Sequence, residues 1–245
     1  MTMKARAAIL AAAVIVLAAV PLHAAPPDLK LTADGIGSVS APLQIVIVLT
    51  LLSFLPAVLV IMTSFTRIVI VFHFLRQALG TQEVPSNMVL IGLTLFLTMF
   101  VMAPVADRIN EVAVQPAIAG KVSIGDAVLL ATPALRDFML KQTRQKDLAL
   151  FVELSGSPRP AQASDLSMRV VVPAYAISEL KTGFQMGFFV FIPFVLIDLV
   201  VSTTLLSMGM MQLPPAMISL PFKLLLFVMV DGWNLIVTSL VRSFA

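Results

Sequence analysis

The chain has 245 residues, of which 59% are hydrophobic and only 12% are charged, and it contains no cysteine. An average soluble domain carries roughly 25% charged residues, so this composition excludes an ordinary soluble protein and favours one buried in lipid or in a large assembly. Without cysteine and with only two histidines, the chain has no disulfide framework, no thiol nucleophile and no zinc site of the Cys/His kind. Of the 16 basic residues, Lys4 and Arg6 lie in an expected leader, which leaves 14 against 13 acidic residues, too even a balance for nucleic-acid binding.

The first 24 residues have the organisation of a cleaved secretory signal peptide. A short basic start is followed by an apolar run of 14 residues, Ala7–Val20, and then by small residues up to Ala24. We expect cleavage after Ala24, because a cut after Ala25 would leave a proline directly behind it. An uncleaved anchor is the alternative. Residues 25–42 are rich in Pro, Gly, Ser and Asp, and we expect a flexible lead-in there.

Residues 43–106 are expected to form a first hydrophobic helical hairpin. Leu43–Met62 offers twenty uncharged residues, enough for a helix to cross about 30 Å of hydrocarbon. A turn is expected at Gly80–Asn87, and Met88–Val105 is the second span, which we expect Pro104 and the charged pair after it to close. The first hairpin therefore accounts for two apolar segments.

Arg67 and Arg76 lie in the helical pattern that continues beyond the first span. They are nine residues apart, which is two and a half helical turns. The two side chains therefore point to opposite sides of one helix, which suits an element that protein surrounds on all sides.

Residues 107–183 are expected to form an extracytoplasmic helical domain. They carry nine basic and eight acidic residues, the composition of an ordinary aqueous domain. We expect Thr132–Pro133 to start an amphipathic helix that buries Phe138 and Met139, and Pro173 to open a helix that continues into the third apolar segment. No strand of useful length is predicted.

Residues 184–245 are expected to form a second hydrophobic hairpin. The spans Phe184–Leu206 and Pro221–Phe244 are joined by a methionine-rich turn in which Pro214–Pro215 should end the helix. With the N-terminus outside, four crossings place residues 107–183 outside the cytoplasm and both hairpin turns inside. The fold class is thus an all-α membrane protein of two long helical hairpins.

Three charged residues lie within the second hairpin. An Asp at the centre of a span costs about 2.5 to 3.5 kcal/mol on the insertion scale, so Asp198 and Asp231 are candidates for pairing or function. Lys223 lies nearer the turn. Asp198 is expected to lie deeper by roughly five to seven residues, or about 8 to 10 Å, so we expect pairing between neighbouring copies of the chain.

Three interpretations of these carboxylates remain open: structural ion pairing in an oligomer, a proton or ion relay, and an intramembrane aspartyl protease. The first is favoured. The protease is disfavoured because Gly232 follows Asp231, whereas such proteases place a glycine before the aspartate. The sequence contains no Ser/His pair or phosphate-binding loop, so we expect neither an enzyme nor a cofactor.

Met208, Met210 and Met211 form a cluster beside Gly209 in the second turn. Methionine is flexible and apolar, so a ring of such side chains can seal a pore and still yield to a passing chain. Gap filling in a helix turn is the alternative.

Long strings of this sequence resemble the FliP family of type III export-gate proteins along nearly all of the expected mature chain. They are Phe65–Val71, Gly80–Gln82, Val89–Leu93, Pro173–Gln185, Phe191–Phe194, Ile197–Val200, Ser207–Met211, Ile218–Lys223 and Val230–Trp233. The chain departs from the family pattern at Gln212, where the methionine run usually continues, and at the Glu83–Met88 turn.

The resemblance implies a gate subunit at the bacterial inner membrane, in the flagellar basal body. It implies a homopentamer that assembles with FliQ and FliR, with FlhA and FlhB of the export apparatus nearby, into a channel for unfolded flagellar proteins. The methionine cluster would be its gasket. The homologous gate of a virulence secretion system is the alternative, and a proton-coupled carrier is a further one, although the internal repeats typical of carriers are not evident.

Overall fold

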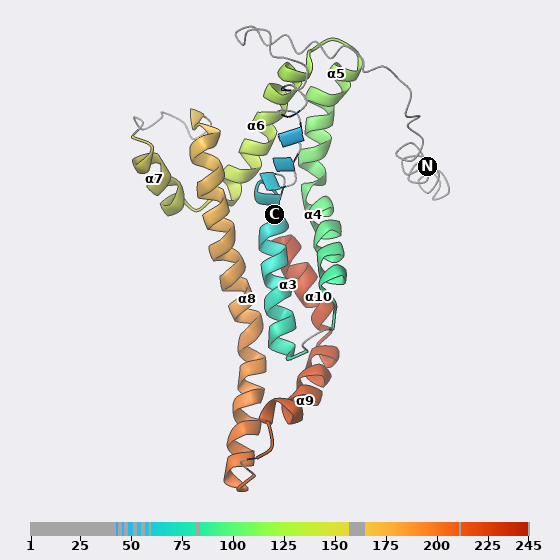
Figure 1. Ribbon diagram of the computed structural model, residues 1–245, viewed down its shortest axis with the longest axis vertical. Coiled ribbons are helices and arrows are strands. Elements are labelled where there is room, and N and C mark those ends of the chain that lie inside the picture. The colour runs from blue at the N-terminus through green and yellow to red at the C-terminus, as the bar shows by residue number, and fades with distance from the viewer. Residues whose placement is uncertain are drawn as a thin grey trace, which may run out of the picture. The chain divides into compact units, whose positions relative to one another are not determined.

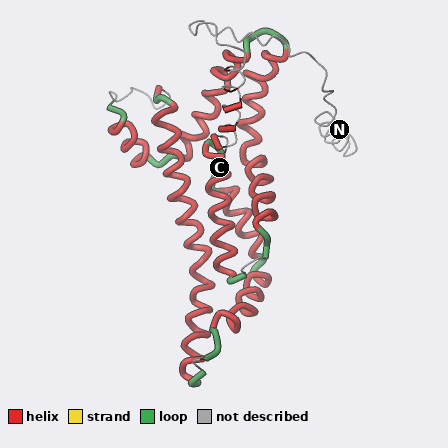
Figure 2. The backbone as a smooth tube through the Cα atoms, viewed as in Figure 1, coloured by secondary structure: helices red, strands yellow, loops and turns green. Residues whose placement is uncertain are grey.

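In the computed structural model, the described residues are 60–81, 84–156, 165–210 and 212–244, together with separate positions between 43 and 58. The expected signal peptide (1–24) and lead-in (25–42) lie outside them. Residues 50–245 form one compact unit, to which the following description applies. Every regular element described is a helix, as predicted (Figure 2).

The helices follow one another in a chain of hairpins (Figure 1). They are α3 (Phe65–Leu79), α4 (Asn87–Ile109), the π-helix η1 (Asn110–Val114), α5 (Gln115–Ile118), α6 (Ile124–Gln142), α7 (Gln145–Leu154), α8 (Met168–Ser207), α9 (Pro215–Met229) and α10 (Gly232–Arg242). Helix α8 has 40 residues, which is about 60 Å of helix. It contacts α3, α6, α7 and α9, so it is the common support of the unit.

The closest helix packing joins α3 to α8. Gly183 and Gly187 lie four residues apart on the buried face of α8, a spacing that lets two helices approach closely. A Cβ atom at Gly187 would lie 2.6 Å from the ring of Phe74, and one at Gly183 would lie 3.2 Å from Ile70. The absence of side chains at these two positions therefore sets the distance between α3 and α8.

Helix α4 does not end at Pro104, contrary to the sequence prediction. The hydrogen-bond ladder continues past the proline, and the Asn110 amide donates to Ala106 and Asp107 before the π-turn leads into α5. Proline removes only its own amide from the ladder. The charged pair Asp107–Arg108 thus lies in the last turn of α4, and the helical run continues beyond it through η1 and α5 to Ile118.

Two further prolines lie inside helices instead of opening them. Helix α6 begins at Ile124, where the Oγ atom of Ser123 accepts from the Asp126 amide at 3.2 Å, so the predicted start at Thr132–Pro133 is wrong. Its predicted apolar face is confirmed, since Phe138 and Met139 are buried.

Helix α8 likewise begins before Pro173, at Met168, and is capped by Ser167. It then runs without interruption into the apolar segment, as predicted. The proposed domain boundaries at 106/107 and 183/184 consequently fall inside α4 and α8. The amino-acid composition changes at these two boundaries, but the helices continue through them. The separate extracytoplasmic domain therefore remains a prediction.

The turn after α8 is made by Gly209 and not by the two prolines. Gly209 adopts a left-handed conformation (φ 75°), its amide donates to Leu206, and the Met210 amide donates to Leu205. These two bonds form a Schellman motif, which closes a helix C-terminus. Pro215 then occupies the first turn of α9, where a missing amide has little effect.

The final apolar segment is broken where a continuous span was predicted. Asp231 adopts a left-handed conformation (φ 51°) between α9 and α10, and the two helices differ in direction by 63°. The neighbouring Gly232 is required there, since a Cβ atom would lie 2.2 Å from the Phe227 ring. Asp231 thus lies at a helix break and not midway along a span.

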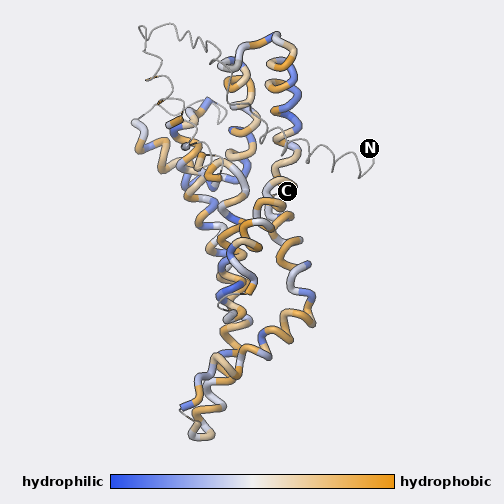
Figure 3. Tube along the Cα trace, turned by 45° about the vertical axis from the view of Figure 1, so that its right-hand side comes forward, coloured by the Kyte–Doolittle hydropathy of each residue, from blue (hydrophilic) through white to orange (hydrophobic). Residues whose placement is uncertain are grey.

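Within the described residues, two helical stretches are long and apolar enough to cross a membrane, Asn87–Ile118 and Met168–Ser207, and the bent pair α9–α10 would be a third. Figure 3 shows the hydrophobic character of the α8–α9 hairpin in orange. Nine of the twenty residues of the expected span Leu43–Met62 lie outside the described residues, and the four-crossing arrangement remains a prediction.

We predict that Gly187→Ala destabilises the detergent-solubilised monomer by about 1 to 3 kcal/mol, because the added methyl group forces α3 and α8 apart. Gly92→Ala is the matched control. That position lies inside α4, and a Cβ atom added there would meet no other atom within 4 Å, so alanine should be neutral or stabilising. Thermal unfolding of both variants measures the difference, and equal melting temperatures would contradict the close packing.

Candidate functional site

A buried ion pair joins α3 to α8. Arg67 and Glu179 are 2% and 0% exposed. The Arg67 Nε atom donates to Glu179 Oε2 at 2.9 Å, and Nη2 donates to Glu179 Oε1, which makes the pair bidentate. Planar bidentate pairing is the geometry that suits arginine and a carboxylate best. The prediction from helix spacing identified Arg67 but not its partner.

Further donors of Arg67 reach other parts of the chain. Nη2 donates to Gln142 Oε1 at 3.1 Å, and Nη1 donates to the carbonyl and hydroxyl oxygens of Ser243, each at 2.9 Å. The guanidinium also lies 3.9 Å from the centre of the Phe244 ring. One buried arginine therefore connects α3, α6, α8 and the segment after α10.

A second polar network attaches α7 to α8. Asp147 is 2% exposed, accepts from Ser178 Oγ at 2.9 Å and pairs with Lys181. The hydrogen bond from Lys181 lowers the pKa of Asp147 below its ordinary value of 3.8, against the opposing effect of burial, and Ser178 and Arg144 act with Lys181. The carboxylate is thus kept ionised inside the fold.

Arg144 reinforces this attachment from the loop before α7. Its amide donates to Ser178 Oγ at 3.0 Å, and its guanidinium donates to Thr182 and Gln185. On the same helix, Tyr175 donates its hydroxyl hydrogen to the Thr63 carbonyl at 2.8 Å. The polar side chains of residues 175–185 are therefore contacts between helices.

Asp198 and Lys223 pair within one chain. Lys223 Nζ donates to Asp198 Oδ2 at 2.6 Å, and Ser219 Oγ donates to Oδ1 at 2.6 Å. Lys223 is buried, whereas the Asp198 side chain is 40% exposed. The expected difference in depth, which led us to expect pairing between copies and not within one hairpin, is therefore wrong.

The difference in depth was overestimated because α9 begins earlier than the sequence predicted. The depth estimate counted Lys223 from Pro221, but the helix begins at Pro215, so Lys223 lies eight residues into α9 and Asp198 lies nine residues before the end of α8 at Ser207. At about 1.5 Å per residue these depths match within roughly 2 Å.

The other two predicted charges occupy less enclosed positions. Arg76 is half-buried, donates to the Asn87 side chain and lies 3.5 Å from His73 Nδ1, so it links α3 to the start of α4. Asp231 is exposed in the single chain and accepts from Asn234 Nδ2 at 3.1 Å. Asp198 and Asp231 are not brought together, and no contact supports a shared proton.

The described methionines of the cluster lie at the apex of the α8–α9 hairpin. Met208 is 67% exposed and Met210 is 42% exposed, on either side of left-handed Gly209. Met211 lies outside the described residues. Met208 and Met210 are therefore available to contact something other than this chain.

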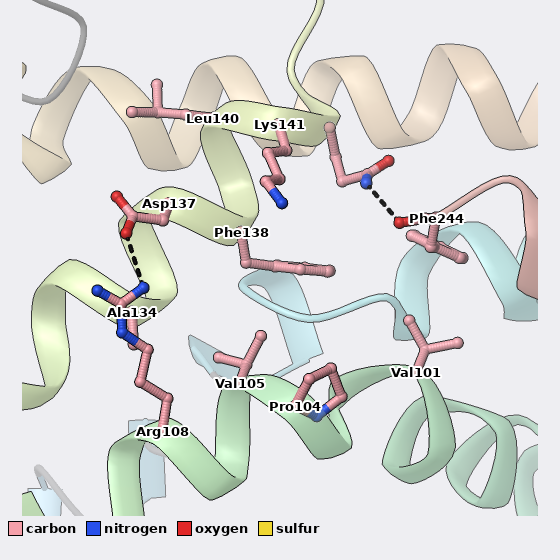
Figure 4. A pocket seen from close by; sticks show the side chains of 11 residues that line it. Val101, Pro104, Val105, Arg108, Ala134, Asp137, Phe138, Leu140, Lys141 and Phe244 are labelled. Carbon is pink, nitrogen blue, oxygen red and sulfur yellow. Dashed lines mark hydrogen bonds and ion pairs between the residues drawn. The ribbon is translucent and has the colours of Figure 1, made fainter. Parts of the chain in front are cut away.

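A cavity of about 540 Å³ lies between α4, α6 and Phe244 (Figure 4). Its walls are largely apolar, and Arg108 and Asp137, which line it, form an ion pair of 3.0 Å.

Among the described residues, no group of three or more His, Asp or Glu side chains could hold a metal ion.

Comparison with known proteins decides the family. The model of the FliP family matches residues 48–240. The chain belongs to the FliP family. It is 54% identical to the flagellar biosynthetic protein FliP of Bacillus subtilis over 207 residues, which are 84% of this chain and 94% of that protein.

Two further relatives carry the same name. The FliP protein of Pectobacterium carotovorum is 53% identical over 211 residues, 86% of this chain and 82% of that protein. The FliP protein of Aquifex aeolicus is 44% identical over 221 residues, 89% of this chain and 91% of that protein. The resemblance seen in the sequence strings is confirmed, and membership of this family agrees with the expectation that the chain is not an enzyme.

Several site residues were not singled out from the sequence: Glu179, Asp147, Ser178, Lys181, Gly183 and Gly187. A signal was nevertheless present. In the string Pro173–Gln185, polar residues recur at spacings of three and four, which places them on one helical face. A polar face on a helix that continues into an apolar segment indicates contacts with protein.

We predict that Asp198→Ala destabilises the monomer by about 2 to 3 kcal/mol, because it leaves Lys223 buried without a counter-charge. The double variant Asp198→Leu/Lys223→Met should recover most of this loss. Arg108→Ala, which removes an exposed pair, should change stability by less than about 1 kcal/mol. Thermal unfolding in detergent measures all three, and a loss confined to the oligomer would favour pairing between copies.

The Asp147 network predicts sensitivity to acid. The pKa of Asp147 is lowered in the folded chain, so its stabilising contribution is present above the unfolded value and disappears as pH falls through the folded one. Melting temperatures measured between about pH 5 and pH 2 should fall, and Asp147→Asn should flatten this part of the curve. Asp137→Asn, at an exposed ion pair, is the control and should leave the slope unchanged.

Proposed function

We propose that the chain is a core subunit of the flagellar type III protein export gate, located in the bacterial inner membrane at the flagellar basal body. In this proposal, copies of the chain form a ring, a homopentamer, that assembles with FliQ and FliR. FlhA and FlhB are its neighbours in the export apparatus. Unfolded flagellar proteins pass through the channel during flagellum assembly.

The observation that carries this proposal is the exposed methionine apex in a chain of this family. Met208 and Met210 are exposed where Gly209 closes α8, ahead of Pro215 at the start of α9. Thioether side chains can contact varied polypeptides without specific hydrogen bonds. This suits a seal that must close on itself and yield to many different substrates.

The proposed topology has its N-terminus outside the cytoplasm. A signal peptide cleaved after Ala24 would leave the mature chain beginning at Ala25, with residues 107–183 outside the cytoplasm. The methionine apex would then face the cytoplasmic side, where substrates enter. N-terminal sequencing of the assembled protein tests the leader, and retention of Met1 would contradict it.

The gate of a virulence secretion system is the second candidate, since such gates share these motifs. The three relatives described above are all named as flagellar proteins, which favours the flagellar assignment. A carrier would require an ion site, and the pairing of Asp198 with Lys223 and Ser219 leaves that carboxylate already occupied.

The proposal is tested in a strain that lacks its own copy of the gene. The wild-type chain should restore secretion of flagellar subunits and motility, and the purified complex should appear as a closed ring in negative-stain images. Restoration of virulence-substrate secretion without motility would favour the second candidate, and a monomeric particle that supports solute uptake would favour a carrier.

We predict that replacing Met208, Met210 and Met211 by alanine leaves ring assembly intact and raises leakage of ions and small solutes. The physical reason is that these side chains would face the lumen and bury little against neighbouring helices. Met217→Ala is the matched control, because Met217 is also exposed (74%) but lies on α9 beyond the turn. Conductance through the assembled variants decides the matter, and unchanged leakage would show that the cluster serves packing alone.

A further inference from the structure

The hydrogen bonds of Arg67 are completed by a segment that follows the last helix. A guanidinium has five N–H donors. The Nε donor and one Nη2 donor bind Glu179, another from Nη2 binds Gln142, and the two from Nη1 bind the carbonyl and hydroxyl oxygens of Ser243. Ser243 therefore takes two of the five donors of an arginine that is 2% exposed.

Phe244 completes the same site. Its ring lies 3.9 Å from the Arg67 guanidinium carbon and stacks on Phe138, with ring centres 6.4 Å apart and planes inclined by 19°. Its carbonyl oxygen accepts from Gln142 Nε2 at 3.1 Å, while Gln142 Oε1 accepts from Arg67. Figure 4 shows this bond and the Phe244 ring beside Phe138. The backbone carbonyls of Ser243 and Phe244, the Ser243 hydroxyl and the Phe244 ring thus all contact one site within the chain.

We propose that Ser243–Phe244 is an internal ligand of a site built by Arg67, Gln142, Glu179 and Phe138, and that its docking makes the chain competent to assemble. The assembly step rests on the proposed function. Docking itself does not, because it takes place within one chain.

The position of α10 shows what such a ligand would hold in place. Helix α10 has 11 residues and follows a 63° break at Asp231, so α9 does not fix its direction by helix continuity. Its start is packed by Trp233 against Phe227, with ring centres 5.4 Å apart. Its middle packs Ile236 and Leu240 into the core, and its far end is attached to α3 and α6 through Ser243 and Phe244.

Loss of docking would leave buried donors without acceptors. An unpaired charged donor in an enclosed site is strongly unfavourable, so the Arg67 guanidinium would shift to find other acceptors and distort its pairing with Glu179. The close packing of α3 on α8 borders this pair. Chains in the undocked state would therefore present an altered surface to their neighbours, and we expect them to be excluded from the ring.

The test compares three single variants of the full chain: Ser243→Ala, Phe244→Ala and the control Ser239→Ala. Ser239 lies one turn earlier on α10 and is exposed. We expect Ser243→Ala to lower the melting temperature of the monomer by about 4 °C, the scale for loss of one charge-assisted hydrogen bond in a chain of this size. Phe244→Ala should lower it by about as much, because it removes the ring that contacts Arg67 and stacks on Phe138. The ratio of oligomer to monomer should fall about tenfold, and Ser239→Ala should match the wild type.

A double-variant comparison shows whether the effect passes through Arg67. In an Arg67→Lys background the additional effect of Ser243→Ala should vanish, because lysine lacks the fork that binds Ser243. If Arg67→Lys does not fold, Gln142→Leu combined with Ser243→Ala serves the same purpose, because each change removes one acceptor of Arg67 and the two effects should then not be additive. Additive effects, or single variants that melt and assemble like Ser239→Ala, would overturn the proposal. A wild-type chain that fails to restore secretion would contradict the proposed function and leave the melting comparison unaffected.

Discussion

The buried pair of Arg67 and Glu179 is the constraint on which the rest of the unit depends. Two charges removed from water are unfavourable unless every donor and acceptor is satisfied. Satisfying Arg67 requires α8, the end of α6 and the segment after α10 to arrive at the same place. The pair therefore contributes less to net stability than to uniqueness, since other arrangements of these helices would leave a buried guanidinium unpaired.

Helix α8 connects this buried pair to the other helices of the unit. Its first half presents Tyr175, Ser178, Glu179 and Lys181 to three neighbouring segments, and Gly183 and Gly187 then allow α3 to approach. Beyond these glycines the helix is apolar and meets α9 through the Asp198–Lys223 pair. Polar contacts thus fix one end of the hairpin system, while the other end depends on apolar packing and on the bonds of Asp198 to Lys223 and Ser219.

The sequence predicted the helical class, the long apolar segments and the family, because hydrophobic length and extended strings of residues are local signals. It mislocated the helix ends at Pro104, Pro133 and Pro173. A proline inside a helix and a proline at its start look alike when only composition is considered, and neighbouring helices decide between them. The same error in the start of α9 misplaced Lys223 relative to Asp198. The partners of the charged residues could not be predicted, for a different reason. Arg67 and Glu179 are 112 positions apart in the sequence, and Arg67 and Ser243 are 176 apart, so the local sequence does not specify these contacts.

The uninterrupted length of α8 gives it the properties of a lever. One continuous helix of about 60 Å carries the docking site of α7 in its first half and the methionine apex at its far end. From Ser178 to the end of α8 is about 44 Å, so a tilt of about 5° about the docking site would displace the apex by about 4 Å. Small changes in how the polar half of α8 is packed would thus be amplified at the distant turn.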